Sequence, residues 1–177
     1  MPEIVQVPDP VLKKPAEPVA SDEIQSQRIQ DIITRMKAAL HDTDDGVAIA
    51  APQIGESVRI FLVRDKVFED RGDMSEKDTV FINPEIINTS SDTVEMTEGC
   101  LSLKHHFGKT ERSRQATVQA LDETGQEFTL GGSGLLAQIF QHEIDHLDGI
   151  VFTDHARDVQ DIRNRKSETI KANIHEE

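Results

Sequence analysis

The stretch QHEIDHLDG, residues 141–149, constrains this chain more than any other, because it holds two histidines four residues apart with an acid between them. On an α-helix the side chains of His142 and His146 point the same way, so both imidazoles can bind one metal ion. Glu143 is then placed to move protons in a metal-dependent hydrolysis. The sequence therefore predicts a helix that presents an HExxH motif to a metal centre.

A catalytic metal normally takes a third protein ligand, and the sequence offers three possibilities. The longer HExxHxxGxxH pattern of one peptidase class fails, because Phe152 stands where its last histidine belongs. Glu168 would fit a second class of zinc peptidase, which takes a glutamate from a following helix. Cys100, in EGCLS, would leave one metal position open for water or substrate. Cys100 also has two other interpretations, as a small buried residue or as a thiol nucleophile paired with a histidine.

Length and charge limit the remaining classes. With 177 residues and 36% hydrophobic content, residues 1–177 are expected to form a single domain. The net charge of -14 repels phosphate backbones, so no DNA partner is expected. The sequence shows neither a signal peptide nor an apolar run of membrane-spanning length, which predicts a cytoplasmic protein without a membrane partner. In such a reducing compartment the single cysteine stays available as a thiolate.

Apolar periodicity predicts three helices. The first is expected to begin at Ser21 or Asp22 and to bury a face made of Ile29, Ile32, Ile33, Met36 and Leu40. The second, which carries the histidines, is expected to be capped by Ser133 and stopped by Gly149, with its apolar face made of Leu135, Leu136, Ile139, Phe140, Ile144 and Leu147. A third, weakly specified helix is expected over residues 156–177, with Val159, Ile162, Ile170 and Ile174 at roughly helical spacing.

Short β-rich runs lie between these helices. They are VRIFLV, VFINPEII, TVEMTEGCLSL, ATVQALD and EFTLGG, and DETG reads as a hairpin turn between the last two. The proline-rich first twenty residues are expected to form an extended arm, and Asp65 to Asp78 and the pair His105 and His106 to lie in loops. We predict an α+β fold in which small, mostly antiparallel sheets pack around the central HExxH helix, with an N-terminal and a C-terminal helix.

Three separate motifs make the chain resemble the peptide deformylases. GVAIAAPQ from Gly46 to Gln53, EGCLS from Glu98 to Ser102 and QHEIDH from Gln141 to His146 occur in the order and spacing of that family. The resemblance extends to about Thr153. It implies an enzyme that removes the N-formyl group from the initiator methionine of newly made polypeptides and releases formate. It also implies one divalent metal ion, natively Fe²⁺, with Zn²⁺, Ni²⁺ or Co²⁺ as substitutes.

The resemblance also assigns roles to residues of this chain. It implies that Cys100, His142 and His146 bind the metal and that Glu143 is the acid/base. The side chain of Gln53 and the backbone N–H of Leu101 would donate to the formyl oxygen. The substrate cleft would be lined by Gly46, Val47, Ala48 and Gly99. Glu98 and Arg112 match a pair that braces the cysteine strand, and an exposed ion pair worth under about 1 kcal/mol is the alternative.

Two positions depart from the family pattern. Ala48 stands where the first motif usually has a second glycine. Lys104, one residue beyond EGCLS and Leu103, stands where a proline is common. Both are expected near the cleft, so they bear on specificity rather than on reaction type. If Ala48 faces the peptide, its methyl group should weaken binding, and Ala48→Gly should lower KM with little change in kcat.

The sequence is also compatible with two other functions. One is a zinc peptidase that uses His142, His146 and Glu168. The other is a non-catalytic, metal-stabilised module at the ribosome, which would have no reason to keep both Glu143 and Gln53. By resemblance, the C-terminal segment from Ala156 would contact the ribosome. Its basic residues are offset by acids, so the contact should be weak and lost with salt.

Overall fold

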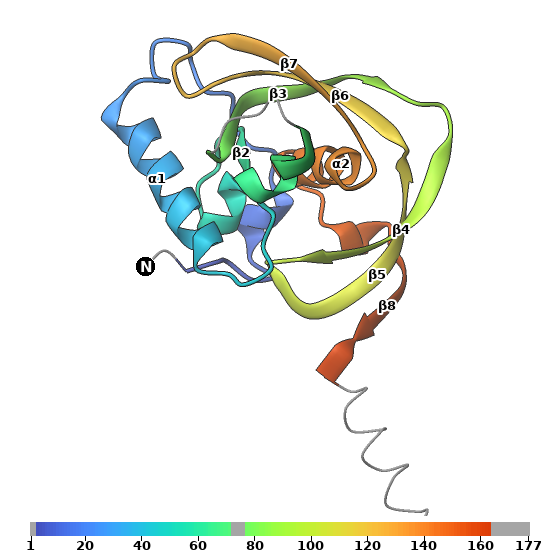
Figure 1. The fold of residues 1–177 in the computed structure, drawn as a ribbon. Helices are drawn as coiled ribbons and strands as arrows, with labels where there is room; N and C mark the ends of the chain where they lie inside the picture. Colours follow the sequence, from blue (N-terminus) through green and yellow to red (C-terminus); the bar gives the residue numbers. More distant parts are fainter. Residues whose placement is uncertain (1–2, 72–76, 164–177) are drawn as a thin grey trace, which may run out of the picture.

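The computed structural model describes residues 3–71 and 77–163, which form two helices and two antiparallel sheets (Figure 1). The helices are α1 (Gln27–His41) and α2 (Leu135–Leu147). The five-stranded sheet has the order β1 (Ala48–Ala50), β2 (Ile60–Val63), β3 (Thr79–Thr89), β6 (Gln115–Leu121) and β7 (Glu127–Ser133). The three-stranded sheet has the order β4 (Thr93–Cys100), β5 (Leu103–Ser113) and β8 (Arg157–Asp161). The predicted α+β class is confirmed.

Helix α2 is the centre of the molecule. It lies between the two sheets, with β2, β3, β6 and β7 on one side and β4 and β5 on the other (Figure 1). Ten of its thirteen residues are buried, and Phe140 packs against the stacked rings of Phe61 and Phe81, whose centroids are 4.4 Å apart. Burial on both sides fixes the helix, and so fixes where its histidines point.

Helix α2 begins at a different residue than predicted but ends where predicted. The prediction that Ser133 caps the helix is wrong. Ser133 still pairs with Gln115 in the sheet, and Gly134 occupies the N-cap position. Leu135 was expected on the buried face, but it is 51% exposed. The predicted stop at Gly149 is confirmed: its φ is +77°, and its N–H and that of the next residue bond back to the last turn.

Helix α1 has the predicted buried face but begins later than expected. Ser26, rather than Ser21 or Asp22, caps it, and the Ser26 hydroxyl accepts a hydrogen bond from the N–H of Ile29. The residues before Ser26 form turns that bury Ile24. Tertiary packing of that side chain therefore sets the start of the helix, which propensity alone does not reveal.

Within the described residues, the structure departs from three expectations about loops and the C-terminus. Residues 157–161 form strand β8, because they pair with β5 in place of continuing a helix, and Val159 is exposed. Residues 164–177, with Glu168, Ile170 and Ile174, lie outside the described residues. His105 and His106 belong to strand β5. The predicted loop from Asp65 begins with a 3₁₀ helix, η3 (Asp65–Arg71), that buries Phe68.

The proline-rich start is confirmed as an arm laid over the domain. It contains one 3₁₀ turn, η1 (Pro10–Lys13), and hydrogen-bonds to segments far away in sequence. Two more 3₁₀ turns, η2 (Ala51–Ile54) and η4 (Phe152–Asp154), follow β1 and α2. Within residues 3–71 and 77–163, no helix is long and apolar enough to span a bilayer.

Candidate active site

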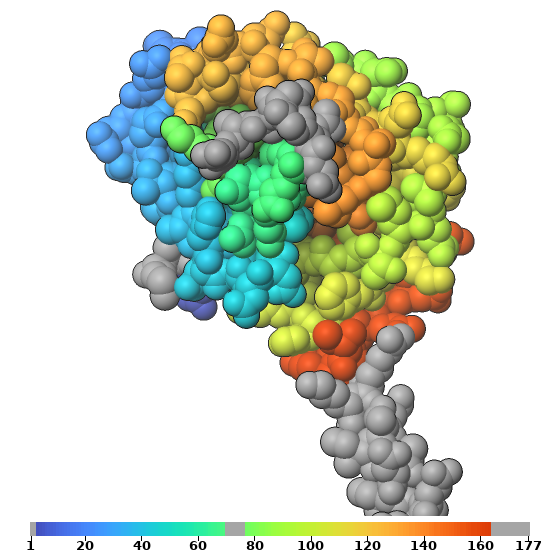
Figure 2. All heavy atoms as spheres, viewed as in Figure 1, coloured from blue at the N-terminus to red at the C-terminus, as the bar shows by residue number. Residues whose placement is uncertain are grey.

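The three sequence motifs meet at one cleft with a volume of about 620 Å³. Strand β4 ends there with Cys100, α2 supplies His142 and Glu143, and η2 supplies Gln53. On the face drawn in Figure 2, the cyan segment after α1 lies beside the yellow-green β4–β5 hairpin, and both contribute to the cleft lining. Residues that are about 90 positions apart in sequence, from Gln53 to Glu143, therefore surround one space.

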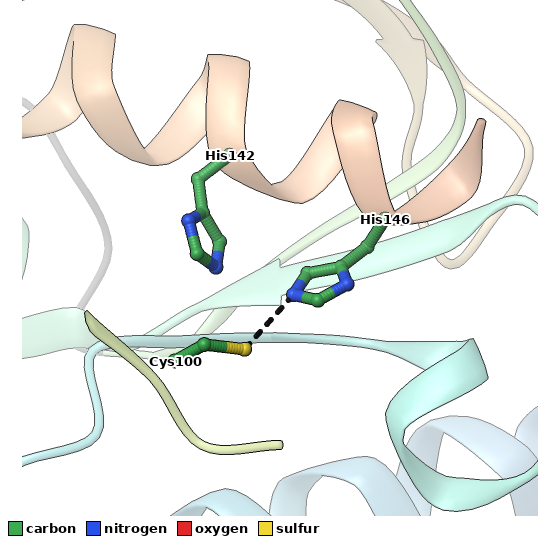
Figure 3. Close-up of side chains that lie close together, drawn as sticks. All are labelled: Cys100, His142 and His146. Carbon is green, nitrogen blue, oxygen red and sulfur yellow. Dashed lines mark hydrogen bonds between the residues drawn. The ribbon is translucent and has the colours of Figure 1, made fainter. Parts of the chain in front are cut away.

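Cys100, His142 and His146 form the candidate metal centre (Figure 3). Both histidines descend from α2 towards the cysteine, and the three ligand atoms all lie within 4.8 Å of one another. Nε2 of His146 is 3.2 Å from the Cys100 sulfur. Donors around one tetrahedral zinc-sized ion are about 3.3–3.8 Å apart, given bond lengths of about 2.0–2.3 Å. The donor set therefore fits one divalent ion with a position left for water or substrate.

A buried ion pair orients the first histidine. Nδ1 of His142 donates to Oε1 of Glu98 over 2.6 Å, which leaves its Nε2 for a metal. Two nitrogens of Arg112 bind the same carboxylate at 2.7 and 3.0 Å, and the Thr110 hydroxyl donates to it as well. Glu98 and Arg112 are only 4% and 6% exposed, so the exposed ion pair considered from sequence is wrong. Arg112 also reaches Asp145 on α2 at 2.7 Å.

The electrostatics of this cluster favour a cation. Burial alone would raise the pKa of Glu98, but hydrogen bonds from His142 and Arg112 hold it well below its ordinary value, so Glu98 is ionised. Burial would lower the pKa of His142, yet Cys100 and Glu98 raise it well above normal. Burial and the nearby His142 lower the pKa of His146, which keeps its ring neutral and able to bind a metal. A divalent ion would supply the positive charge that these acids attract.

Glu143 has the surroundings of a general acid/base. It is buried beside the ligands, and its Oε2 has no hydrogen-bond partner among the described residues. Burial raises the pKa of Glu143 to about 7, and the charges of Glu98 and Asp145 act in the same direction. A carboxyl group with such a pKa can both accept and release a proton near neutral pH.

Gln53 is held in one orientation. Its Oε1 accepts from the N–H of Ala50 at 2.9 Å, so its Nε2 points towards Ser102 Oγ at 3.2 Å and the Cys100 sulfur at 3.5 Å. The amide donor therefore points towards the candidate metal centre. Ser102 was not singled out from sequence, and no periodicity or spacing marks it as a partner of Gln53.

The N-terminal arm positions both predicted oxyanion donors, a role that the sequence did not reveal. Nε2 of Gln6 donates to the carbonyl of Leu101 at 3.0 Å, and the N–H of Val7 donates to the carbonyl of Ser102 at 2.9 Å. The N–H of Val5 donates to the carbonyl of Gln53 at 2.8 Å. These bonds link segments up to 95 residues apart, so only the fold brings them together.

The residues expected to bind substrate all line the cleft: Gly46, Val47, Ala48 and Gly99. Ala48 is only 7% exposed and also packs in the core cluster around α2. Gly99 lies under the Phe107 ring, where a Cβ atom would come within 2.6 Å of that ring. Lys104 and His105 line the cleft as well, and both are exposed.

Comparison with known proteins decides the family. The family model described as polypeptide deformylase matches residues 1–161. The chain belongs to the polypeptide deformylase family. Peptide deformylase 2 of Clostridium acetobutylicum is 39% identical over 146 residues, which cover 82% of this chain and 89% of that protein. The peptide deformylase of Dehalococcoides mccartyi is 40% identical over 153 residues, covering 86% of this chain and 84% of that protein.

Solved deformylase structures share the fold. The peptide deformylase from Legionella pneumophila has a TM-score of 0.78 and 32% identity, covering 100% of this chain and 99% of that one. A class I type b peptide deformylase from Acinetobacter baumannii, bound to Met-Ala-Ser, has a TM-score of 0.76 and 33% identity, covering 86% and 96%. The chain is therefore a deformylase, a metal-dependent hydrolase that removes the N-formyl group from newly made polypeptides. The resemblance found from sequence is confirmed, and the zinc-peptidase and non-catalytic alternatives are disfavoured.

Proposed function

We propose that Cys100, His142 and His146 bind one divalent ion, natively Fe²⁺, and that Glu143 and Gln53 use this site to deformylate formyl-methionyl nascent peptides. The observation that carries the proposal is the grouping of three ligand atoms within 4.8 Å beside the buried, unpartnered Oε2 of Glu143. A thiolate and two imidazoles suit several first-row metals, so Zn²⁺, Ni²⁺ and Co²⁺ are substitutes. The bound ion supplies a Lewis acid that lowers the pKa of water and polarises the formyl oxygen.

Glu143 carries the proton through the reaction. Its carboxylate takes a proton from the attacking water, whose oxygen then bonds to the formyl carbon. When the C–N bond breaks, the same carboxyl group returns the proton to the leaving nitrogen. The products are formate and a peptide with a free amino terminus. The pKa of about 7 supports both transfers at one pH.

Two donors stabilise the oxygen that gains negative charge. Nε2 of Gln53 is held towards the centre by the Ala50 N–H and Ser102, and the N–H of Leu101 lies in the turn that the N-terminal arm supports. Loss of one such donor commonly costs about 100- to 1000-fold in kcat. Neither donor has to move far during the reaction, because both belong to segments fixed by several hydrogen bonds.

The substrate and its setting belong to the same proposal. The Met-Ala-Ser peptide bound by the Acinetobacter baumannii enzyme supports a peptide lying along Gly46, Val47, Ala48 and Gly99 in the corresponding cleft. A free thiolate ligand needs a reducing compartment, which supports action in the cytoplasm. We further propose weak, salt-sensitive ribosome contact through the C-terminal segment, where Arg157 at the start of β8 is exposed.

Formate release from formyl-methionyl peptides, measured without oxygen and with iron or nickel supplied, tests this function. Glu143→Ala should retain the metal and lose nearly all turnover, because it removes proton transfer without removing a ligand. Glu111→Ala is a matched control, since Glu111 is an exposed acid on β5 away from the cleft lining. A Glu143→Ala enzyme with turnover near that of wild type would exclude the proposed mechanism.

A further inference from the structure

The pairing of β4 with β5 is interrupted directly beside Cys100. Cys100 pairs with Leu103, but the preceding residue, Gly99, pairs with Phe107. Residues 104–106 therefore bulge out of the ladder between these strands. His105 within the bulge has a φ of +67°, a left-handed conformation that is uncommon outside glycine. Bulges beside active sites commonly redirect side chains.

The bulge is anchored on one side and free on the other. Nδ1 of His106 donates to the carbonyl of Lys104 at 2.9 Å, and His106 also pairs with Asp161 of β8. Lys104 and His105 are exposed and line the cleft. Within the described ranges 3–71 and 77–163, no ion pair engages the Lys104 ammonium group. Lys109, on the same strand, pairs with Glu95 at 3.0 Å and does not line the cleft.

The bulge lies beside the candidate metal centre, because its first residue follows the strand partner of Cys100. Lys104 follows Leu103, the direct cross-strand partner of Cys100. Glu3, Asp42 and Asp45 are exposed acids that line the cleft as well. Paired Cα atoms in a sheet are about 4.5–5.5 Å apart and neighbouring ones about 3.8 Å, so Cα of Lys104 lies within about 10 Å of that of Cys100. A lysine side chain at that distance can reach the residues that follow a formyl-methionine bound at the metal centre.

We propose that residues 104–106 are a specificity element that favours formyl-methionyl peptides with an acidic second or third residue. This inference rests on the proposed function. An extended peptide advances about 3.3 Å per residue, so those two side chains lie within roughly 10 Å of the formyl group. Lys104 follows the strand partner of Cys100 and has no ion-pair partner among residues 3–71 and 77–163. Opposite charges in an exposed pair of this kind correspond to a preference of about 1.5- to 5-fold in kcat/KM.

The test uses the metal-loaded enzyme and five peptides: formyl-Met-Gln-Ser, formyl-Met-Glu-Ser, formyl-Met-Lys-Ser, formyl-Met-Ala-Glu and formyl-Met-Ala-Lys. At pH 8 and low salt, we expect glutamate to be preferred over lysine by about 1.5- to 5-fold at one of the two positions. The difference should appear in KM and shrink in 0.5 M salt, where charges are screened within about 4–5 Å.

Substitutions then assign the preference to the bulge. Lys104→Gln should bring the glutamate-to-lysine ratio to about 1, and Lys104→Glu should invert it. Lys109→Gln removes the same charge from the same strand outside the cleft and should leave the ratio unchanged. A ratio near 1 in the wild type at both positions, or an unaltered ratio in Lys104→Gln, would overturn the inference. Wild-type turnover of the neutral peptide tests the proposed function separately, since it does not depend on Lys104 charge.

Discussion

Glu98 and His142 are joined by a hydrogen bond of 2.6 Å, from Nδ1 of the imidazole to a carboxylate oxygen. The same carboxylate is bound by Arg112, which in turn reaches Asp145 on the helix that carries both histidines. Strand β4 and helix α2 are thus connected by charged groups behind the candidate metal site. This network fixes the imidazole so that its other nitrogen is free for a metal ion.

Glu98→Gln should therefore weaken metal binding by about 10- to 100-fold, as expected when the outer partner of a ligating histidine is changed. It should also lower the free energy of unfolding, because Arg112 loses a buried counter-charge. Titration against a competing chelator measures the first effect. Glu95→Gln, on the same strand but exposed, is the control and should bind metal as the wild type does. An unaltered affinity in Glu98→Gln would separate Glu98 from metal binding.

Asp122 should make the stability of the β6–β7 hairpin depend on pH. Its Oδ1 accepts from the N–H groups of Thr124 and Gln126 at 2.8 and 2.9 Å. Burial would raise the pKa of Asp122, but the hydrogen bond from the Thr124 hydroxyl at 2.7 Å and these backbone bonds hold it below its ordinary value. The ionised form is thus favoured in the folded state, so its stabilisation is present above the unfolded pKa of about 3.9 and is lost as pH falls through the folded pKa.

Asp122→Asn should consequently lower the free energy of unfolding by about 0.5–1.5 kcal/mol at pH 7, the typical net contribution of a hydrogen bond, because solvent screens this partly exposed carboxylate. The gap between variant and wild type should narrow below about pH 4, as the wild-type carboxylate becomes protonated. Urea denaturation at both pH values measures this. A gap that is the same at pH 7 and pH 3 would show that the carboxylate charge does not stabilise the turn.

Ala48→Gly restores the glycine that is usual at this position in the family and tests how Ala48 affects substrate binding. Ala48 lines the cleft, yet it is only 7% exposed and also packs in the core cluster around α2. We expect a lower KM for formyl-methionyl peptides with little change in kcat or metal content. We also expect a loss of about 1 kcal/mol in stability, because a strand gains a glycine and a buried methyl group is removed. An unchanged KM would place the methyl group wholly in the core.

The spacing of residues along the sequence was sufficient to predict features that lie within a single helix. The HExxH spacing placed His142, Glu143 and His146 on one helix, and periodicity found the buried face of α1. The predictions that were wrong concern residues whose structure depends on contacts between distant segments. Ser133 could not cap α2 because it is still paired in the sheet, and residues 157–161 joined β5 as a strand. The burial of Glu98 and Arg112 could not be predicted either, since it depends on α2 lying against β5 and hydrogen-bonding to β4 through Gln138.

Metal content of Cys100→Ala, measured together with that of Glu168→Ala after anaerobic purification, tests the central claim most directly. Cys100 supplies the sulfur of a three-ligand site whose atoms lie within 4.8 Å of one another. Wild type and Glu168→Ala should each hold about one divalent ion per chain and release formate from formyl-methionyl peptides, and Cys100→Ala should do neither. A Cys100→Ala protein that keeps full metal content, while Glu168→Ala loses it, would contradict this account.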